Sequence, residues 1–291
     1  MIALPARPSI CPPNRWSAWL LALIAALATA CGSTTPTTSP QPSSAGVPSV
    51  EPTTAPSIPA SGPSALVPSG PPPASQGAGA PAGPGASIDP ANFVSTIDNP
   101  WFPLIPGTIL TYRGVKDGEV ADETFTVTKA TKVVAGVTCV VVHDELKLAG
   151  DLAETTDDWY AQDRDGNVWY FGEATKELEG GKVVSTEGSW QGGVDGAEPG
   201  IYMPAHPAIG QSALQEFYAG QAEDHFVVLL TSTKVKVPFG SFSDALLTAE
   251  WTPLEPGVLS EKFYVKGTGE VREADVAGGD EKLELTKVVR P

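Results

Sequence analysis

Two histidines and several nearby carboxylates are the side chains best suited to bind a metal ion. His206 lies next to Pro207, and Glu223 and His225 are two positions apart, which would place both on one face of a strand. Imidazole and carboxylate groups together hold zinc, and oxygen ligands alone hold calcium. No HExxH or similar zinc motif is present, so a solvated face is favoured and a resident divalent cation is not expected. A metal-dependent hydrolase using His206 and His225 remains an alternative.

Signals for nucleophilic catalysis are weaker. The chain has no Gly-x-Ser-x-Gly, Ser-x-x-Lys or Gly-rich phosphate loop. Cys139 lies in a β-branched run and is predicted to be a small buried hydrophobe. Along an extended strand His143 would be roughly 13 Å from it, too far to activate a thiol. Acids such as Asp158 and Glu250 cannot be assigned to a catalytic pair without distances. The sequence therefore names no catalytic residue and favours a role without enzymatic activity.

The segment 163–167 contains carboxylate and amide oxygens around a glycine, as calcium-binding loops do. An EF-hand loop would place three oxygen ligands at alternating positions before the glycine, a glutamate several residues later, and a helix on each side. Asp163, Asp165 and Asn167 do not follow that pattern. We predict a hairpin turn stabilised by Asx side chains, because Asp165-Gly166 lies between apolar runs.

Aromatic residues flank this predicted turn. Strand alternation would place Trp159 on one face of the hairpin and Tyr160 on the other, with Trp169 and Tyr170 divided in the same way. In sugar-binding modules such residues form a flat stacking surface, whereas in a disulfide-free β-domain they more often pack in the core. Packing is favoured, and these four aromatics are the candidates for a ligand-facing surface.

The elements that would position these residues are strands. Glycine-containing turns separate short runs rich in β-branched and aromatic residues, and no segment has a convincing helical stripe. We expect an all-β fold, a single antiparallel β-sandwich, half-barrel or barrel. An apolar plug of Trp101, Phe102, Leu104 and Ile105 is expected across one end of the sheet. The predicted strands are 109–114, 124–134, 137–143, 158–162, 168–171, 182–190, 213–218, 225–234, 246–251, 261–266, 270–277 and 282–289.

The composition is strongly acidic and excludes some partners. The chain has 291 residues and a formal charge of −16. Its first 31 residues hold two of the 18 basic residues and none of the 34 acidic ones, so the remainder has a charge of about −18. Such a chain is repelled by nucleic acid and by anionic headgroups. High negative charge is also a common means of keeping a protein soluble.

Residues 1–31 have the pattern of an export signal. Arg7 and Arg15 precede fifteen residues, 16–30, that are mostly apolar, which is short for a membrane span. The sequence Leu27-Ala28-Thr29-Ala30-Cys31 resembles the lipobox of bacterial lipoproteins, although that family usually has Leu where this chain has Ala28. The resemblance implies diacylglycerol on Cys31 and a membrane anchor. Two acyl chains give durable anchoring.

Residues 32–86 are predicted to be a disordered linker. They consist almost entirely of Pro, Ser, Thr, Ala and Gly, with Glu51 as their single charge and no aromatic residue. Such a segment cannot bury enough apolar surface to offset its ordering entropy. It would act as a stalk for the antiparallel β-domain at residues 87–291.

The β-domain itself resembles uncharacterised secreted β-domains of actinobacterial-type lipoproteins. The resemblance lies in the segments 92–107, 157–173, 237–246 and 261–272, with a Pro-x-Gly-x-Phe turn at Pro238 and a Tyr-x-x-Gly-x-Gly turn at Tyr264. It implies architecture and an extracytoplasmic location, and it carries over no catalytic residue.

Together these features predict a lipid-anchored lipoprotein of the cell surface. Its β-domain would be a binding or structural module of unknown ligand, and its partners would be the membrane, through the lipid, and a cell-wall polymer, lipid or protein. A carrier of a lipid or other apolar ligand in a half-barrel cavity is an alternative, and the metal-dependent hydrolase is another. No organic cofactor is expected.

Overall fold

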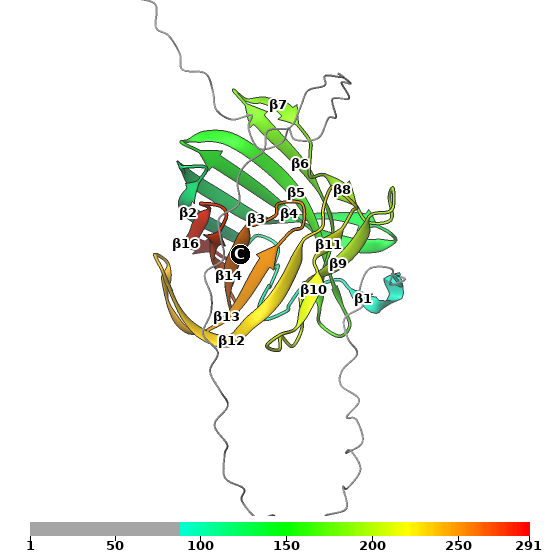
Figure 1. Cartoon of the computed structure of the whole chain (residues 1–291). Coiled ribbons are helices and arrows are strands. Elements are labelled where there is room, and N and C mark those ends of the chain that lie inside the picture. Colours follow the sequence, from blue (N-terminus) through cyan, green and yellow to red (C-terminus); the bar gives the residue numbers. More distant parts are fainter. Residues whose placement is uncertain (1–87) are drawn as a thin grey trace, which may run out of the picture. The chain divides into compact units, whose positions relative to one another are not determined.

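The computed structural model describes residues 88–291, and these form one highly curved antiparallel sheet (Figure 1). Within this range there is no α-helix, and a single 3-10 turn, Pro90–Asn92, precedes the strands. The all-β prediction is therefore confirmed, in its barrel form. The strands are β1 (Phe93–Val94), β2 (Ile109–Lys116), β3 (Glu119–Val134), β4 (Val137–Leu148), β5 (Asp151–Asp163), β6 (Val168–Glu179), β7 (Lys182–Ser185), β8 (Trp190–Gln191), β9 (Glu198–Met203), β10 (Ser212–Leu214), β11 (Glu216–Phe217), β12 (His225–Val237), β13 (Gly240–Trp251), β14 (Leu259–Val265), β15 (Gly269–Ala277) and β16 (Lys282–Val289).

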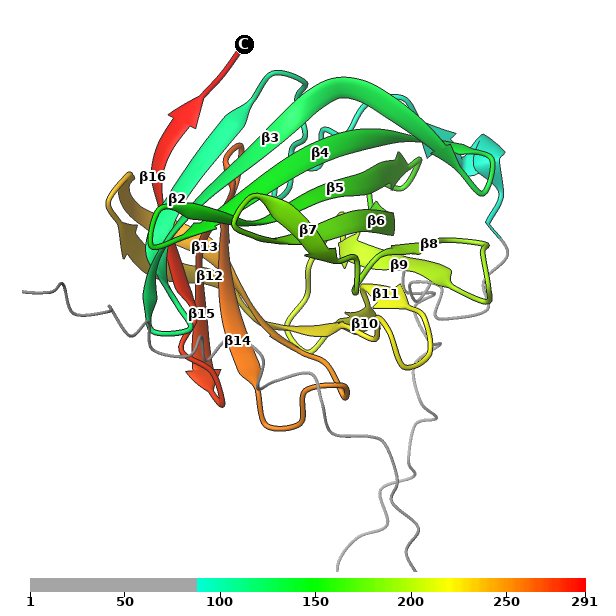
Figure 2. The ribbon, with the colours of Figure 1, turned by 90° about the horizontal axis from the view of Figure 1, so that it is seen from above.

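The sheet curls until its two ends meet at one segment of the chain. Its order is β10-β12-β13-β14-β15-β16-β2-β3-β4-β5-β6-β9-β11. The two end strands, β10 and β11, are separated only by Gln215, so this residue joins the ends of the sheet. Gly200 of β9 lies directly against the backbone of Leu214 and Gln215, and a Cβ at this position would clash with both. Figure 2 shows β3–β6 on one side of the curved sheet and β12–β15 on the other.

The predicted hairpin is formed by β5 and β6. Tyr160 pairs with Tyr170, and the turn contains Gly166 with a φ of +90°, a conformation that glycine adopts readily. The buried Asp163 carboxylate accepts hydrogen bonds from the backbone and side-chain nitrogens of Asn167 at 2.8 and 2.9 Å, and from Trp169 Nε1 at 2.9 Å. Because protein donors occupy this carboxylate, the prediction of an Asx turn is confirmed.

The predicted apolar plug closes one end of the sheet, with one exception. Trp101, Phe102 and Leu104 are buried in the larger of two apolar clusters, whereas Ile105 is 51% exposed. Asn99 fixes the segment: its side-chain oxygen accepts from the backbone nitrogens of the next two apolar residues, and its amide nitrogen donates to the carbonyl oxygens of Gly166 and Pro204. The plug is thereby tied to the β5–β6 turn.

Three details of the predicted strands are wrong. The predicted strand 182–190 is interrupted by a turn at Gly188, where φ is +86°, and becomes β7 and β8. The predicted strand 213–218 is divided at Gln215 into β10 and β11. Strand β9 was not expected, because it contains Pro199 and Gly200, which are unfavourable in strand interiors.

The export signal, the linker 32–86 and the lipidation site Cys31 lie outside the described residues. Within residues 88–291, no helix is long and apolar enough to cross a membrane.

Candidate functional site

The curved sheet encloses a water-accessible cavity of about 220 Å³, here called the lumen. Eight of its lining side chains are carboxylic acids and two are lysines. At full ionisation the lumen would thus carry six more negative than positive charges. Its lining comprises Phe102, Leu110, Tyr112, Lys116, Glu123, Phe125, Asp144, Leu146, Glu154, Thr156, Asp158, Tyr160, Glu173, Tyr202, Lys262, Glu270, Glu273 and Glu281.

Strand alternation explains why these residues share the lumen. On β5, every second residue from Glu154 to Tyr160 faces inward. The pairing of Asp158 with Glu173 on β6 places their carboxyl groups side by side. On the other side of β5, Asp144 of β4 pairs with Thr156. The register of three adjacent strands therefore gathers acids that are far apart in sequence.

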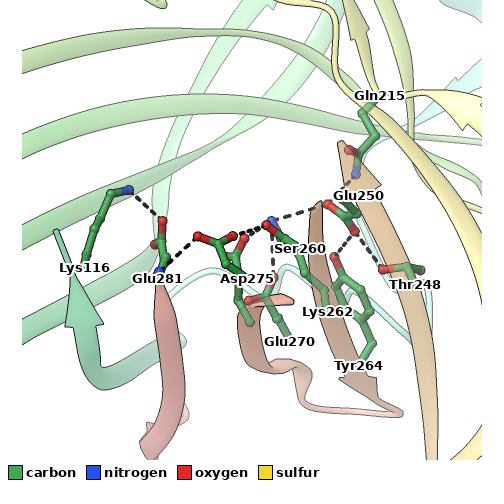
Figure 3. A network of polar contacts seen from close by, with 11 residues as sticks. Lys116, Gln215, Thr248, Glu250, Ser260, Lys262, Tyr264, Glu270, Asp275 and Glu281 are labelled. Atoms are coloured by element: carbon green, nitrogen blue, oxygen red, sulfur yellow. Dashed lines mark hydrogen bonds and ion pairs between the residues drawn. The ribbon is translucent and has the colours of Figure 1, made fainter. Parts of the chain in front are cut away.

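One side of the lumen has its own cation. Lys262 on β14 places its Nζ 3.4 Å from Glu250 Oε2, 3.5 Å from Glu273 Oε1 and 4.0 Å from Glu270 Oε2. Figure 3 shows this ammonium group between the carboxylates of neighbouring strands. Burial alone would lower the pKa of Lys262, but attraction to these carboxylates outweighs that effect and raises the pKa well above its usual value. Lys262 is therefore permanently charged at neutral pH.

The same side holds a second lysine and a hydrogen-bonded glutamate (Figure 3). Lys116 Nζ lies 2.9 Å from Glu281 Oε2. Besides the ion pair with Lys262, the Glu250 carboxylate accepts hydrogen bonds from the hydroxyls of Thr248 at 2.8 Å and Tyr264 at 3.2 Å, and from the Gln215 amide at 3.3 Å. We call this side the lysine wall: Lys116 and Lys262 with Glu250, Glu270, Glu273 and Glu281.

The other side carries five carboxylates on β3–β6 and has no internal cation. We call it the acidic wall: Glu123, Asp144, Glu154, Asp158 and Glu173. Among residues 88–291, no lysine or arginine forms an ion pair with any of these five. Burial, together with repulsion from neighbouring acids, raises the pKa of all five, to about 7 for Asp158 and about 8 for Glu173. The acidic wall therefore holds protons near neutral pH.

Two acids of this wall share one tyrosine hydroxyl. The Tyr170 hydroxyl oxygen lies 2.6 Å from Asp158 Oδ1 and 3.1 Å from Glu173 Oε2. A phenol has one proton and can donate to only one of them at a time. The second contact becomes a hydrogen bond only when that carboxyl group is itself protonated and donates to the phenol oxygen. Because the contact with Asp158 is the shorter one, the phenol proton is assigned to the hydrogen bond with Asp158. Because the pKa of Glu173 is the higher one, the carboxyl proton is assigned to Glu173, which donates to the phenol oxygen.

Aromatic rings form one end of the lumen. Tyr160 is stacked on Tyr170 with ring centroids 4.8 Å apart, and it contacts Phe102 and Tyr202 edge-on at 5.3 and 5.1 Å. Tyr160 is only 4% exposed and lines the lumen, yet its hydroxyl makes no hydrogen bond with another residue in the range 88–291. A buried hydroxyl without a protein partner normally bonds to water or a ligand.

The four aromatic candidates divide between two environments. Tyr160 and Tyr170 face the lumen, whereas Trp159 and Trp169 belong to the opposite face of the hairpin, as strand alternation predicted. The Lys132 ammonium lies 3.0 Å from the centroid of the Trp159 ring. All four side chains are buried in the larger apolar cluster. Tyr160 is the one whose hydroxyl is open to a ligand.

The metal candidates are distributed over separate surface positions. His206 is exposed in the loop after β9, and the His225 ring stacks on Trp251 at 5.3 Å between centroids. Glu223 precedes β12 and does not share a strand with His225, which corrects that expectation, and its carboxylate accepts from the Gly220 backbone nitrogen at 2.7 Å. Within the described residues, no group of three or more His, Cys, Asp or Glu side chains is arranged to hold a metal ion.

Cys139 is fully buried, and burial raises the pKa of its thiol to about 12. His143 binds Asp157 instead, with 2.7 Å between Nδ1 and Oδ1. The prediction of Cys139 as a buried hydrophobe is confirmed.

Sequence reasoning missed the lumen. It considered Asp158 and Glu250 but could not combine them with partners, and it did not consider Glu173 or Lys262. The signal in β5 was weak: Glu154, Thr156 and Asp158 share one face of the strand, but Thr155 and Asp157 make the other face polar as well.

No protein-family model matches the chain, and no curated protein matches it either. Two solved structures show a distant likeness. One is a protein described as exported, with a YmcC-like fold, from Bacteroides fragilis: identity 15%, TM-score 0.37, covering 65% of this chain and 99% of that one. The other is described as a lipoprotein from Parabacteroides distasonis: identity 11%, TM-score 0.35, covering 65% and 98%. No conclusion about location or activity follows from scores this low.

Proposed function

We propose that this chain is an extracytoplasmic lipoprotein, anchored through lipid on Cys31, whose β-domain binds a small hydrophilic ligand of positive charge in the lumen. The leader and the lipobox-like sequence support the anchor. The binding role rests on one observation, the excess of six acids over lysines in the lining of a water-accessible cavity that is partly open to solvent. A binding module is thus favoured over a purely structural one.

The character of the lining argues against an apolar ligand. Eight carboxylic acids line the lumen, and covering them with hydrocarbon would remove their hydration without replacing it. The volume of about 220 Å³ is also below the roughly 300–1,000 Å³ that is usual for pockets that enclose drug-sized ligands. A lipid carrier would need a larger and more apolar cavity.

The hydrolase alternative lacks a supporting arrangement. His206 and His225 occupy a loop and a surface stack, and neither lines the lumen. Binding without chemistry is the function that the geometry supports.

Isothermal titration calorimetry on the purified full-length protein tests the binding role. We expect binding of small organic cations that weakens as salt concentration rises, and no binding of citrate, glucose or a short-chain fatty acid. Tight binding of the fatty acid with no response to any cation would overturn the proposal.

The anchor has a separate test. Replacing Cys31 by Ser should abolish palmitate incorporation and release the protein from the membrane fraction, because serine cannot form the thioether to diacylglycerol. Replacing Cys11 by Ser is the matched control and should leave both unchanged. A Cys31→Ser protein that remains membrane-bound would contradict the anchor.

A further inference from the structure

The lysine wall shows what kind of cation this lumen accommodates. Lys262 presents a primary ammonium group on a slender alkyl chain, and three carboxylates of the two flanking strands, β13 and β15, surround it at 3.4 to 4.0 Å. The acidic wall presents five carboxylates to the same cavity, and none of them forms an ion pair with a lysine or arginine among the described residues. The cation that would complete this wall must therefore come from outside the chain.

A second, independent feature points to a ligand at the same place. The Tyr160 side chain is 4% exposed and lines the lumen, and its hydroxyl has no protein partner in the described range. Tyr160 lies two positions from Asp158 on β5, and its ring stacks at 4.8 Å on that of Tyr170, whose hydroxyl contacts both Asp158 and Glu173. A phenol oxygen there can accept a hydrogen bond from an N–H donor whose other hydrogens bond to the carboxylates.

The arrangement of the acids selects an organic amine over a metal ion. A calcium ion needs six to eight oxygens within about 2.3–2.6 Å of one point. No such convergent group exists within residues 88–291. The five acids are instead spread over four strands, from Glu123 on β3 to Glu173 on β6. A chain with ammonium groups separated by methylenes can reach successive carboxylates, and its narrow cross-section suits the small volume of the lumen.

We infer that the acidic wall is the binding site for a linear aliphatic polyamine, whose ammonium groups contact Asp158, Glu173 and their neighbours as Lys262 contacts the opposite wall. This inference rests on the proposed function and specifies its ligand class and position. One ammonium group lies between Asp158 and Glu173, within reach of the Tyr160 hydroxyl. Glu154 and the pair Glu123 and Asp144 hold the next.

Binding at this wall exchanges protons for the ligand. The protonated carboxyl of Glu173 must release its proton before it can form an ion pair with an ammonium group. The titratable groups around the Asp158–Glu173 pair determine, through their charges, the pH at which these two acids release their protons. They are Glu154, Asp157 and Tyr160 on β5, His143 and Asp144 on β4, Tyr170 on β6, Glu216 on β11 and, through Tyr160, Lys262 on β14.

The experiment is calorimetric titration of the full-length protein with spermidine at pH 7, in phosphate and in Tris. The two buffers differ in ionisation enthalpy, so released protons make the observed heat buffer-dependent. We expect saturable binding with release of about one proton or more, and a release that disappears above pH 9. The double variant Asp158→Asn/Glu173→Gln should lose at least tenfold in affinity and release fewer protons than the wild type.

The controls separate position from general charge. The variant Asp151→Asn/Glu179→Gln removes two exposed acids from the same strands but outside the lumen, and it should bind as the wild type does. Tyr160→Phe removes one hydroxyl and should weaken binding about threefold, which provides a test even if the double variant folds poorly.

Three results would overturn the inference. The first is spermidine binding that survives both Asp158→Asn/Glu173→Gln and Tyr160→Phe; the lumen could then still be a cation site, but not at this wall. The second is calcium or magnesium that displaces spermidine at equal concentration, since a metal site would then explain the acids. The third is the absence of spermidine binding while a monovalent organic cation binds.

Discussion

The two walls of the lumen differ in how their negative charge is balanced. On the lysine wall, Lys116 and Lys262 form ion pairs with four glutamates, so the balancing cations belong to the fold. On the acidic wall burial and mutual repulsion raise the pKa values of all five acids, to about 7 for Asp158 and about 8 for Glu173, so that these two retain protons near neutral pH. The lysine ammonium groups are part of the chain and cannot leave, whereas a proton on a carboxyl group can be replaced by a cation from solution. The comparison indicates that the lysine wall is structural and the acidic wall is the exchangeable side.

The largest expected effect comes from removing the internal cation. Lys262→Met leaves the buried Glu250, Glu270 and Glu273 without their shared partner, and breaking a buried ion pair in this way typically costs about 3–5 kcal/mol. We expect the melting temperature at pH 8 to fall by about 6–20 °C, since about 1 kcal/mol shifts a domain of this size by about 2–4 °C. Differential scanning calorimetry measures this.

A surface lysine on a neighbouring strand provides the control. Lys282 lies 3.0 Å from Glu284, but its side chain is 49% exposed, so Lys282→Met should change stability by less than about 1 kcal/mol. At pH 5 the loss in Lys262→Met should shrink, because Glu273, whose pKa burial raises to about 7, can then be protonated. Equal effects of the two substitutions would remove the distinction between a buried and a superficial cation.

A smaller effect is expected from pH on the unaltered protein. Burial raises the pKa of Asp158 to about 7 and that of Glu173 to about 8, so the folded state binds protons more tightly than the unfolded chain. Their contribution to stability is complete below the unfolded pKa values near 4 and is lost as pH rises through 7 and 8. The melting temperature should therefore be higher at pH 5 than at pH 9, by about 4–8 °C for about 2 kcal/mol.

Lys262 should not contribute to that decline, because its pKa lies above its usual value and its charge persists to pH 9, whereas Glu273 of the lysine wall, whose pKa burial raises to about 7, should add to it. A melting temperature that rises from pH 5 to pH 9 would show that the acidic wall is ionised without penalty. Adding spermidine at pH 9 should recover part of the loss.

The smallest effect is expected from neutralising one acid. Glu173→Gln keeps a group that can hydrogen-bond to Tyr170 but removes the charge, so we expect a gain of about 1 kcal/mol at pH 9 and no change at pH 5. Glu179→Gln, at the exposed end of the same strand, is the control and should stay within about 0.5 kcal/mol at both pH values. Destabilisation by Glu173→Gln at pH 9 would indicate a structural role for its charge.

Much of the fold could be predicted from local sequence. The Asp165-Gly166 turn and the alternation around it predicted the β5–β6 hairpin, because these signals act over a few residues. Strand β9 was missed because Pro199 and Gly200 are unfavourable in strands, and here the close approach of Gly200 to Gln215 outweighs that preference.

The candidate site could not be predicted, because it depends on register between distant strands. Asp158 meets Glu173 through one hairpin, but Lys262 reaches the lumen only when the sheet curls through most of its strands. The residues around His206 and His225 suggested a metal site, but the fold leaves both histidines at the surface. The acidic residues were first interpreted as a means of keeping the protein soluble, but some of them line the lumen.

The junction at Gln215 has a consequence for encounters between copies of the protein. An open sheet of this length would expose a row of free amide and carbonyl groups along each margin, where another chain could add a strand. Here the two end strands of the sheet, β10 and β11, have only three and two residues, and they follow one another in the chain. Along the residues that these short strands cover, no backbone is left for intermolecular pairing, so residues 229–237 of β12 are the part of this margin where another copy could add a strand.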